Sequence, residues 1–399
     1  MSETRPKEPL HPTVKATGWV SFFTDMGSEL IYAVLPFLII DSIKASRAFL
    51  GLIEGLAEAT PAFLRLVAGT LSDRARNRVW LIFSGYLAST AVKPFIALAF
   101  SQWHVLLLRF LDRIGKGIRS APRDALVADL APGPQRGRAF GFQRAMDHMG
   151  AVLGGVSAFV LLNWLGLSIA WAIAASAIPG IASVLVIALF VRDVPGRAAR
   201  ISAPRPPLEG LRALPRVYYA YLAAAALFAL ANSSDVFLLL RARDMGIAVQ
   251  IVPLLWALLH VVKTAASYVC GGLSDRVGRK PVLVSGWILY GLVYIAFGFM
   301  QSAGAAWALF ALYGVFFGAT EGVAKAFVAD LVPAEKRGTA FGLLGMAEGL
   351  LVLPASLLCG ALWDATSTAK LSLVLGGAFA LAAALVLLAL VRAPRGNRP

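Results

Sequence analysis

Twelve apolar segments, each about 20 residues long, follow one another along this 399-residue chain. A helix of about 20 residues rises about 30 Å, the thickness of the hydrocarbon core of a bilayer. With 58% hydrophobic residues and a mean hydropathy of +0.73, the chain is too apolar for a soluble globular protein. We therefore predict an all-α polytopic membrane protein with twelve transmembrane helices. The predicted spans are 16–40, 49–70, 79–100, 104–126, 139–162, 168–191, 217–240, 250–271, 281–300, 305–328, 339–362 and 370–391.

The segments divide six and six around a connector, 192–216, that is rich in Pro and Arg. Such a composition is typical of an exposed linker, here expected in the cytoplasm. We expect an N-terminal six-helix bundle in 1–191 and a C-terminal six-helix bundle in 217–399.

Two loop sequences occur once in each half, which predicts that the bundles are related by pseudo-symmetry. The stretch VADLAPGPQRGRAFGF at 127–142 is answered by VADLVPAEKRGTAFGL at 328–343. Likewise, GTLSDRARNR at 69–78 is answered by GGLSDRVGRK at 271–280. Inward-facing charge in such bundles marks a solute pathway, because an ionisable group facing lipid costs about 3 kcal/mol or more.

The basic residues decide the orientation and the class of partner. The net charge of +15 comes from Lys and Arg in short gaps between apolar segments, mostly on the side of the N-terminus. This pattern predicts cytoplasmic termini in the inner membrane, and it speaks against a nucleic-acid footprint, which forms one clustered face. No cleaved signal peptide is evident, and no Walker A sequence suggests ATP as a cofactor or energy source.

The two cysteines, Cys270 and Cys359, stand apart without a C-x-x-C or Cys/His grouping. The sequence therefore predicts no disulfide framework, no structural metal site and no bound cofactor.

The duplicated GTLSDRARNR and GGLSDRVGRK loops resemble the GxLxDRxGRR signature of the major facilitator superfamily. RFLDRIGKG at 109–117 is similar to the helix-4 signature of that superfamily, with Asp112 and Arg113 where Gln and Gly are usual in drug/proton antiporters. More narrowly, DRIGKGIRSAPRDAL and GATEGVAKAFVADLVP resemble a bacterial subgroup of uncharacterised or metal- and siderophore-associated permeases.

This resemblance implies a monomeric secondary transporter, not an enzyme, whose repeated loops latch the inner gate in one conformation. Arg136 and Arg337 are the expected partners of the loop aspartates. The predicted gating residues are Asp73, Arg74, Asp275, Arg276, Arg136 and Arg337.

Acidic residues near the middle of the first segment are candidates for proton coupling. Asp25 and Glu29 lie one helical turn apart, and two carboxylates at low dielectric repel each other, so that one of them can load a proton. The alternative is a structural pair satisfied by Arg or Lys from a neighbouring helix. Asp235 is expected to face the same cavity from the second half. Arg109, the deepest cation of the fourth segment, is expected to modulate a nearby acid, with Asp112 beside it.

Other charged groups in the apolar segments are candidates for solute binding. The predicted binding residues are Lys93, Arg113, Lys116, Arg144, Asp147, His148, His260, Lys263 and Glu321. Glu321 and Lys325 could instead form a structural pair within one helix, and His148 a structural hydrogen bond instead of a metal ligand. Arg119 is expected to snorkel to the inner surface, while Glu54 and Glu58 are expected near the outer end of their helix.

This mixture of charges favours a small polar or anionic solute, of which a metal chelate is one candidate. We expect the solute to be moved together with protons by alternating access. Efflux of a drug or metal ion by proton antiport is the alternative within the transporter class. A membrane sensor that transports nothing is the alternative outside it.

Overall fold

The structure, a computed structural model, describes residues 9–74, 77–131, 135–193, 214–333 and 336–391, without the side chains of 66, 70, 73 and 74. These residues form helices and loops, and no strand occurs among them. The linker predicted at 192–216 lies mostly outside the described residues.

The first half of the chain contains six helical segments, of which two end in a π-helical turn and one is interrupted. They are α1 (Pro12–Phe37) with η1 (Leu38–Ser42), α2 (Arg47–Arg74), α3 (Arg78–Ala97), α4 (Gln102–Leu130), α5 (Arg136–Phe159) with η3 (Val160–Trp164), and α6 (Ile169–Ala175) followed by α7 (Ala177–Phe190).

The second half repeats the pattern, with its first segment broken into two helices. Its elements are α8 (Arg216–Ala231), α9 (Val236–Asp244), α10 (Val252–Val277), α11 (Arg279–Phe299), α12 (Ala303–Leu331), α13 (Arg337–Thr366) and α14 (Lys370–Leu390). The predicted all-helical membrane fold is confirmed. By length and composition, 10 segments of the described chain could cross a membrane. The predicted spans missing from that set are α2 and α4, which carry the most charge.

Several helices begin where the sequence supplies a cap. The side chains of Asn77, Ser101 and Ser302 each accept a hydrogen bond from a backbone N–H in the first turn of α3, α4 and α12. Such caps satisfy donors that have no partner within the helix, which fixes where each span starts.

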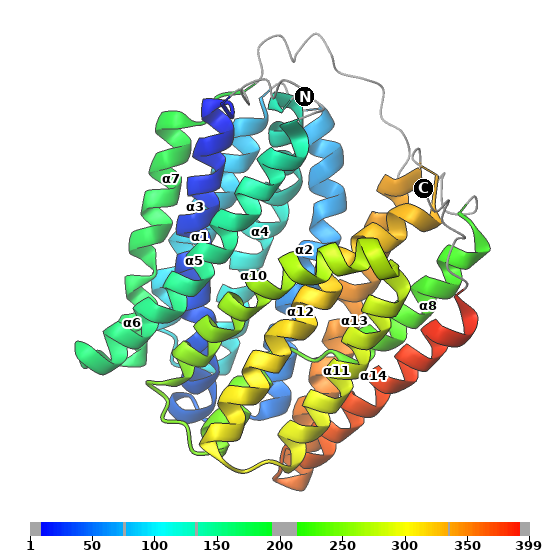
Figure 1. Cartoon of the computed structure of the whole chain (residues 1–399). Coiled ribbons are helices and arrows are strands. Elements are labelled where there is room, and N and C mark those ends of the chain that lie inside the picture. Colours follow the sequence, from blue (N-terminus) through cyan, green and yellow to red (C-terminus); the bar gives the residue numbers. More distant parts are fainter. Residues whose placement is uncertain (1–8, 75–76, 132–134, 194–213, 334–335, 392–399) are drawn as a thin grey trace, which may run out of the picture.

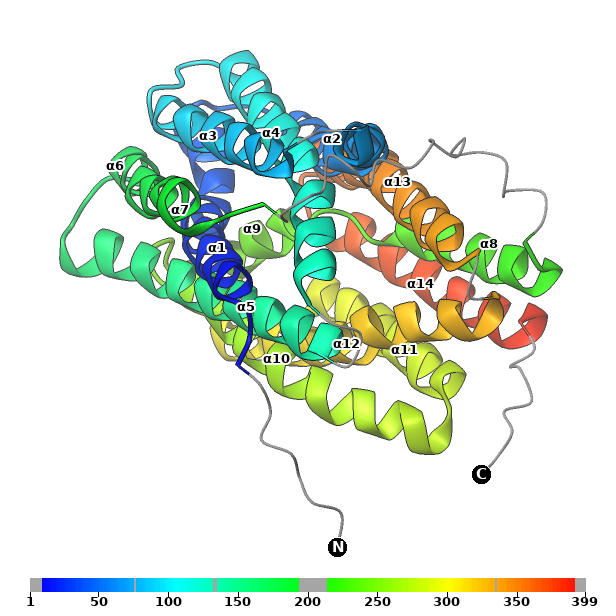
Figure 2. The same ribbon diagram turned by 90° about the horizontal axis from the view of Figure 1, so that it is seen from above.

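The two halves of the chain lie side by side (Figure 1). We call the end of the molecule at which α1 begins and α14 ends the terminal face, and the opposite end the far face. Helices of the second half lean away from the first half toward the terminal face. Viewed from above, α2 runs beside α13 and α5 beside α10, so these two pairs join the halves (Figure 2).

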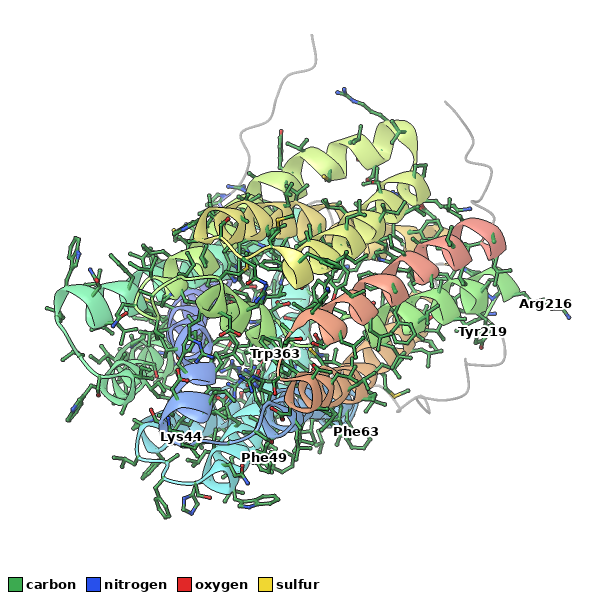
Figure 3. The ribbon with its side chains drawn as sticks, turned by 90° about the horizontal axis from the view of Figure 1, so that it is seen from below. Lys44, Phe49, Phe63, Arg216, Tyr219 and Trp363 are labelled. Atoms are coloured by element: carbon green, nitrogen blue, oxygen red, sulfur yellow. The ribbon has the colours of Figure 1, made fainter. Side chains whose placement is uncertain are left out.

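The far face is closed by contacts between the halves. Asp364 at the end of α13 accepts hydrogen bonds from the backbone N–H groups of Arg47 and Ala48 at 3.1 and 2.8 Å. Arg243 pairs with Asp41 at 2.5 Å. In Figure 3, drawn from this side, Trp363 lies inside the helices while Lys44 and Phe49 lie toward the edge.

Glycines let α2 and α13 pack backbone to backbone here. A Cβ at Gly51 would collide with the backbone of Ser356, and one at Gly55 would collide with Leu353. Small residues at such crossings allow close approach of two membrane helices. The far-face contact therefore depends on the absence of side chains at these two positions.

The segment predicted as one helix over 217–240 is broken between α8 and α9, so that part of the prediction was wrong. Asn, Ser and Asp compete for backbone hydrogen bonds, which favours a break at 232–235. Two tyrosines compensate for the lost helical bonds: Tyr290 donates to the carbonyl of Ala231 at 3.0 Å, and Tyr294 to that of Ser233 at 3.4 Å. Irregular backbone at membrane depth is tolerated where protein groups satisfy it in this way.

Candidate functional site

A cavity of about 300 Å³ lies between the two halves, at mid-depth in the helices. Both halves contribute to it, and most of its charged groups come from α1, α2 and α4. Its lining residues are Asp25, Ser28, Glu29, Tyr32, Glu58, Asp112, Arg113, Lys116, Arg119, Asn232, Ser233, Ser234, Asp235, Trp256, Leu259, His260, Lys263, Phe317 and Val352.

Arg109 is buried beside this cavity and is not among its lining residues. Its guanidinium donates to Glu54 of α2 at 2.8 Å, and the two side chains are 3% and 0% exposed. Asp112 is a second partner at 3.8 Å. The expected acid Asp112 is beside Arg109, and Glu54 is a nearer partner that the sequence did not predict, because α2 packs against α4 here. Glu54 lies about two turns from the start of α2, near one end of its helix as expected, and it is buried.

Asp112 is the best-satisfied acid of the cavity wall. Ser89 of α3 donates to it at 2.5 Å, and the Nε of Arg113 lies 3.7 Å away. A carboxylate held by a hydroxyl and two guanidinium groups is stabilised in its charged form. Its position suits a fixed counter-charge for the α4 cations.

Asp25 and Glu29 both line the cavity, but they have different surroundings. Glu29 accepts a hydrogen bond from the indole N–H of Trp256 at 2.8 Å, which connects α1 to α10 across the halves. Asp25 has no hydrogen bond or ion pair in the described part of the chain. Asp147 and Lys116 lie within its electrostatic reach. Neither acid is paired with Arg or Lys, which removes the structural alternative in the form predicted.

Asp235 reaches the cavity from the break between α8 and α9. The hydroxyl of Tyr313 donates to it at 2.6 Å. Next to it, the hydroxyls of Ser234 and Tyr32 are 3.1 Å apart, so α1 and the broken segment touch directly. The second half therefore holds its cavity acid by a phenol, without a guanidinium.

Toward the terminal face, an ionic bridge joins the halves above the cavity. Glu321 of α12 pairs with Lys263 at 2.8 Å and with Arg144 of α5. The predicted alternative, a Glu321–Lys325 pair within α12, is wrong because Glu321 turns toward α10 and α5. Arg144 also lies 3.9 Å from Asp147.

The two predicted histidines face each other across the halves, with ring centroids 6.3 Å apart. His260 is 8% exposed, lines the cavity, and has its Nε2 4.0 Å from Glu29. His148, Asp147, Arg144 and Glu321 lie outside the cavity lining. Among the described residues no group of three or more His, Cys, Asp or Glu is placed to hold a metal ion.

Lys93 is buried in α3 and is not part of the cavity wall. Its ammonium group donates to Ser28 at 3.3 Å. The helix continues past Pro94, the residue after Lys93, to Ala97. Lys93 therefore contacts α1 through Ser28 and does not line the cavity, in contrast to the prediction that it binds the solute.

The predicted partners of the loop aspartates bond backbone carbonyls: Arg337 donates to that of Ala329, and Arg136 to that of Ala128. In the described part of the chain Arg337 forms no ion pair with Asp275, so the prediction for the second loop was wrong. Asp275 lies 3.9 Å from Arg279, one turn along. Arg276 is exposed. The side chains of Asp73 and Arg74 lie outside the described part.

Instead, both halves use one matched ion pair between their third and fourth segments. Arg78 binds Asp129 at 2.6 Å, and Arg279 binds Asp330 at 2.9 Å. Each pair stays within its own half, at the terminal face. These contacts join neighbouring segments of one bundle and make no link between the bundles.

Lys325 and three charged side chains within its electrostatic reach form a group that we call the vestibule: Arg65, Arg144, Lys325 and Glu348. They come from α2, α5, α12 and α13, and all four are exposed although they lie within apolar helices. Contacts between the halves therefore close the far face, whereas the side toward the terminal face combines the Glu321 bridge with these exposed charges.

Sequence reasoning missed several members of the cavity wall. Trp256, Phe317 and Tyr32 gave no signal, since aromatic residues in apolar helices usually face lipid or core. Arg119 was expected at the inner surface, yet it is buried and lies over the ring of Tyr86 at 4.0 Å. The steps of three residues from Arg113 through Lys116 to Arg119 were the available clue.

Comparison with known proteins gives a consistent result. The chain matches the family model described as Major Facilitator Superfamily over residues 17–262 and again over 238–399. An uncharacterized MFS-type transporter of Methanocaldococcus jannaschii is 34% identical over 385 residues, covering 95% of both chains. A probable 4-methylmuconolactone transporter of Cupriavidus pinatubonensis is 28% identical over 287 residues, which cover 67% of this chain and 63% of that one.

Among solved structures, a bacterial homologue of the human lysosomal transporter Spinster, in an inward-facing and occupied conformation, is similar with a TM-score of 0.76. The two chains are 19% identical, and the match covers 97% of this chain and 98% of the other. At that identity the likeness shows the shared fold.

Proposed function

The chain belongs to the major facilitator superfamily and is a multi-pass membrane transporter, and from this premise we propose that it moves a small polar or anionic solute by proton-coupled alternating access. The observation that carries the proposal is the charged cavity between the halves. Contacts between the halves, such as the ion pair of Arg243 with Asp41, close it at the far face. A site at the interface of two repeats is what alternating access requires.

We further propose that 1–191 and 217–399 are the two bundles that rock about this cavity, in a monomer with both termini in the cytoplasm. The terminal face is then cytoplasmic and the described conformation inward-open. A change to the outward-open conformation would break the ion pair of Arg47 with Asp364 at the far face. It would also bring the four vestibule side chains closer together.

Asp25 is the proposed proton carrier. Glu29 is proposed to link the protonation state of the cavity to the contact between the halves. Asp25 borders the solute cavity without a partner, so it can take up or lose a proton without breaking an internal bond. Glu29 bonds Trp256 across the halves, so its protonation would weaken that contact. Arg109 acts less directly, since Glu54 occupies its guanidinium.

The solute class follows from the cations of α4, and a metal chelate remains one form of it, as the proposed subgroup of metal- and siderophore-associated permeases would suggest. The probable 4-methylmuconolactone transporter among the relatives favours an organic anion. Efflux of a drug or metal ion by proton antiport differs in both direction and solute, and the sensor alternative predicts no flux.

The direct test is transport by the purified chain in proteoliposomes. Candidate anions and chelates are offered outside the vesicles under an inward and then an outward proton gradient. Accumulation that follows the gradient supports the proposal and gives the direction. Absence of flux for every solute that binds the detergent-solubilised protein would favour the sensor alternative.

A further inference from the structure

The cavity has two chemically different walls. The first half contributes the α4 cations Arg113, Lys116 and Arg119, together with the acids Asp25, Glu29, Glu58 and Asp112, and the second half contributes apolar and aromatic groups besides Asp235, His260 and Lys263. The apolar and aromatic groups are Trp256, Leu259, Phe317 and Val352. A ligand that fills the space therefore meets the α4 cations from the first half and apolar surface from the second.

The contrast is sharpest at one pair of corresponding positions. The helices α4 (Gln102–Leu130) and α12 (Ala303–Leu331) begin and end 201 residues apart. Lys116 and Phe317 occupy the same position in these two helices, and both line the cavity. Where the first half places an ammonium group, the second half places a phenyl ring.

Two of the α4 cations are available to a ligand. The side chains of Lys116 and Arg119 have no hydrogen bond and no ion pair in the described part of the chain, although Arg119 lies over the ring of Tyr86. The acids within reach of Lys116 are Asp25 and Glu58. Protonation of Asp25, which the proposed function requires once in each cycle, removes one of the two negative charges within reach of Lys116 and so makes its surroundings more favourable to an anion.

His260 adds a third requirement. Both of its ring nitrogens are buried and lack a hydrogen-bond partner in the described structure, while the ring sits edge-on to Trp256 at 5.1 Å. A buried polar group without a partner costs free energy, so a ligand that supplies a donor or acceptor here is favoured. Beside it, the ammonium group of Lys263 lies over the ring of Phe317 at 4.4 Å, so a cation and an aromatic ring stand together on the second half's side of the cavity.

We propose, building on the function inferred above, that the solute is a small aromatic carboxylate with a hydrogen-bonding substituent on its ring. Lys116 and Arg119 bind the carboxylate, the ring packs against Trp256 and Phe317, and the substituent bonds His260. The volume of about 300 Å³ is at the lower end for ligand pockets, which suits a single substituted ring.

The probe is 4-hydroxybenzoate, added to the purified full-length chain and followed by thermal stabilisation and by counterflow of the labelled compound in proteoliposomes. Three analogues each remove one feature: 4-hydroxybenzyl alcohol the charge, lactate the ring and benzoate the substituent. We expect the first two to bind at least tenfold more weakly, and benzoate several-fold more weakly, than 4-hydroxybenzoate. Equal binding of the uncharged alcohol, or no binding by any of the aromatic acids, would overturn the proposal.

Variants assign each feature to its residue. Lys116→Gln should weaken the aromatic acids about tenfold and leave the alcohol unchanged, whereas the matched Lys15→Gln, on the exposed part of α1, should change neither. Phe317→Leu should reduce the ratio by which 4-hydroxybenzoate binds more tightly than lactate. His260→Phe should abolish the preference for 4-hydroxybenzoate over benzoate. An unchanged preference in both variants would reject this orientation of the ligand.

The same experiment separates this inference from the function on which it rests. Proton-driven uptake of a solute that is not an aromatic acid would leave the transporter proposal intact and defeat the substrate class. Binding of 4-hydroxybenzoate with the predicted variant pattern, but without counterflow, would establish the site and defeat transport.

Discussion

The two halves of the molecule build the same helical scaffold around different interiors. In the first half, the third and fourth segments carry Ser89, Lys93, Arg109 and Asp112. At positions 201 residues later the second half carries Tyr290, Tyr294, Phe310 and Tyr313. The register is fixed by the matched pairs of Arg78 with Asp129 and Arg279 with Asp330.

This difference indicates a division of roles. A buried ion pair adds little net stability, since its desolvation offsets its attraction, so an ionic interior is weak evidence of a structural role. Stacked rings such as Tyr290 and Tyr294, 4.2 Å apart, contribute apolar burial and hold a rigid wall. We infer that the ionic half carries the coupling groups and that the aromatic half provides a firm surface against which the solute binds.

The largest effect is expected from breaking the ionic core at Arg109. Arg109→Leu leaves Glu54 buried and unpaired, which should lower the free energy of unfolding by about 3–5 kcal/mol. Denaturant unfolding of the protein in detergent measures this loss.

Its control is the double variant Arg109→Leu with Glu54→Leu, which removes both charges. It should regain most of the stability, because apolar residues replace the pair. A single variant as stable as the parent protein would show that Glu54 is not an uncompensated buried charge.

A smaller loss is expected in the aromatic half. Tyr313→Phe keeps the ring and removes the hydrogen bond to Asp235, which should cost about 1.5–3 kcal/mol because the acceptor is charged. The same unfolding measurement applies, with Tyr268→Phe on the exposed face of α10 as the matched control. A loss as large as that of Arg109→Leu would contradict the proposed contrast between the halves.

The glycine contact between the halves provides the next test. Gly51→Ala introduces a methyl group against the backbone of Ser356, which should destabilise far-face closure by about 1–3 kcal/mol. Spin labels on Lys44 and Ala248 should then report a wider far face. Gly304→Ala, which meets open space at the start of α12, is the control. An unchanged distance distribution would mean that the contact between α2 and α13 at Gly51 does not control closure of the far face.

The smallest effect is expected at the matched loop pairs. Arg279 is partly exposed, so Arg279→Gln should change stability by less than about 1 kcal/mol. Arg78→Gln should cost more, since this side chain is buried and also bonds Ser72. Equal losses in thermal unfolding would remove this asymmetry between the halves.

The sequence could predict the helices but only part of the site. Apolar length and composition mark ten spans in the described chain, and the steps of three and four along α4 identify Arg113 and Lys116 as inward-facing although that helix carries too much charge to be among the ten. The break after Ala231 was missed, because it depends on Tyr290 and Tyr294 from a distant helix satisfying its carbonyls. The pairing of Glu54 with Arg109 was missed because it depends on which helix packs against α2.

Contacts between the halves could not be predicted from the spacing of residues within one helix, because they also depend on distant helices. Glu321 has Lys325 one turn away in sequence, yet in the fold it pairs with Lys263 and Arg144. Trp256 and Phe317 are ordinary residues for an apolar helix, and only their neighbours make them part of a binding wall.

The most direct test of the division of roles compares one variant from each half in proteoliposomes, using the solute that the flux screen identifies. We predict that Asp25→Asn loses accumulation driven by a pH gradient while keeping solute exchange, because only the proton carrier is lost. We predict that Phe317→Leu keeps gradient-driven accumulation and raises the concentration needed for half-maximal exchange. An Asp25→Asn protein that still concentrates solute with the parent's dependence on the pH gradient would contradict the account.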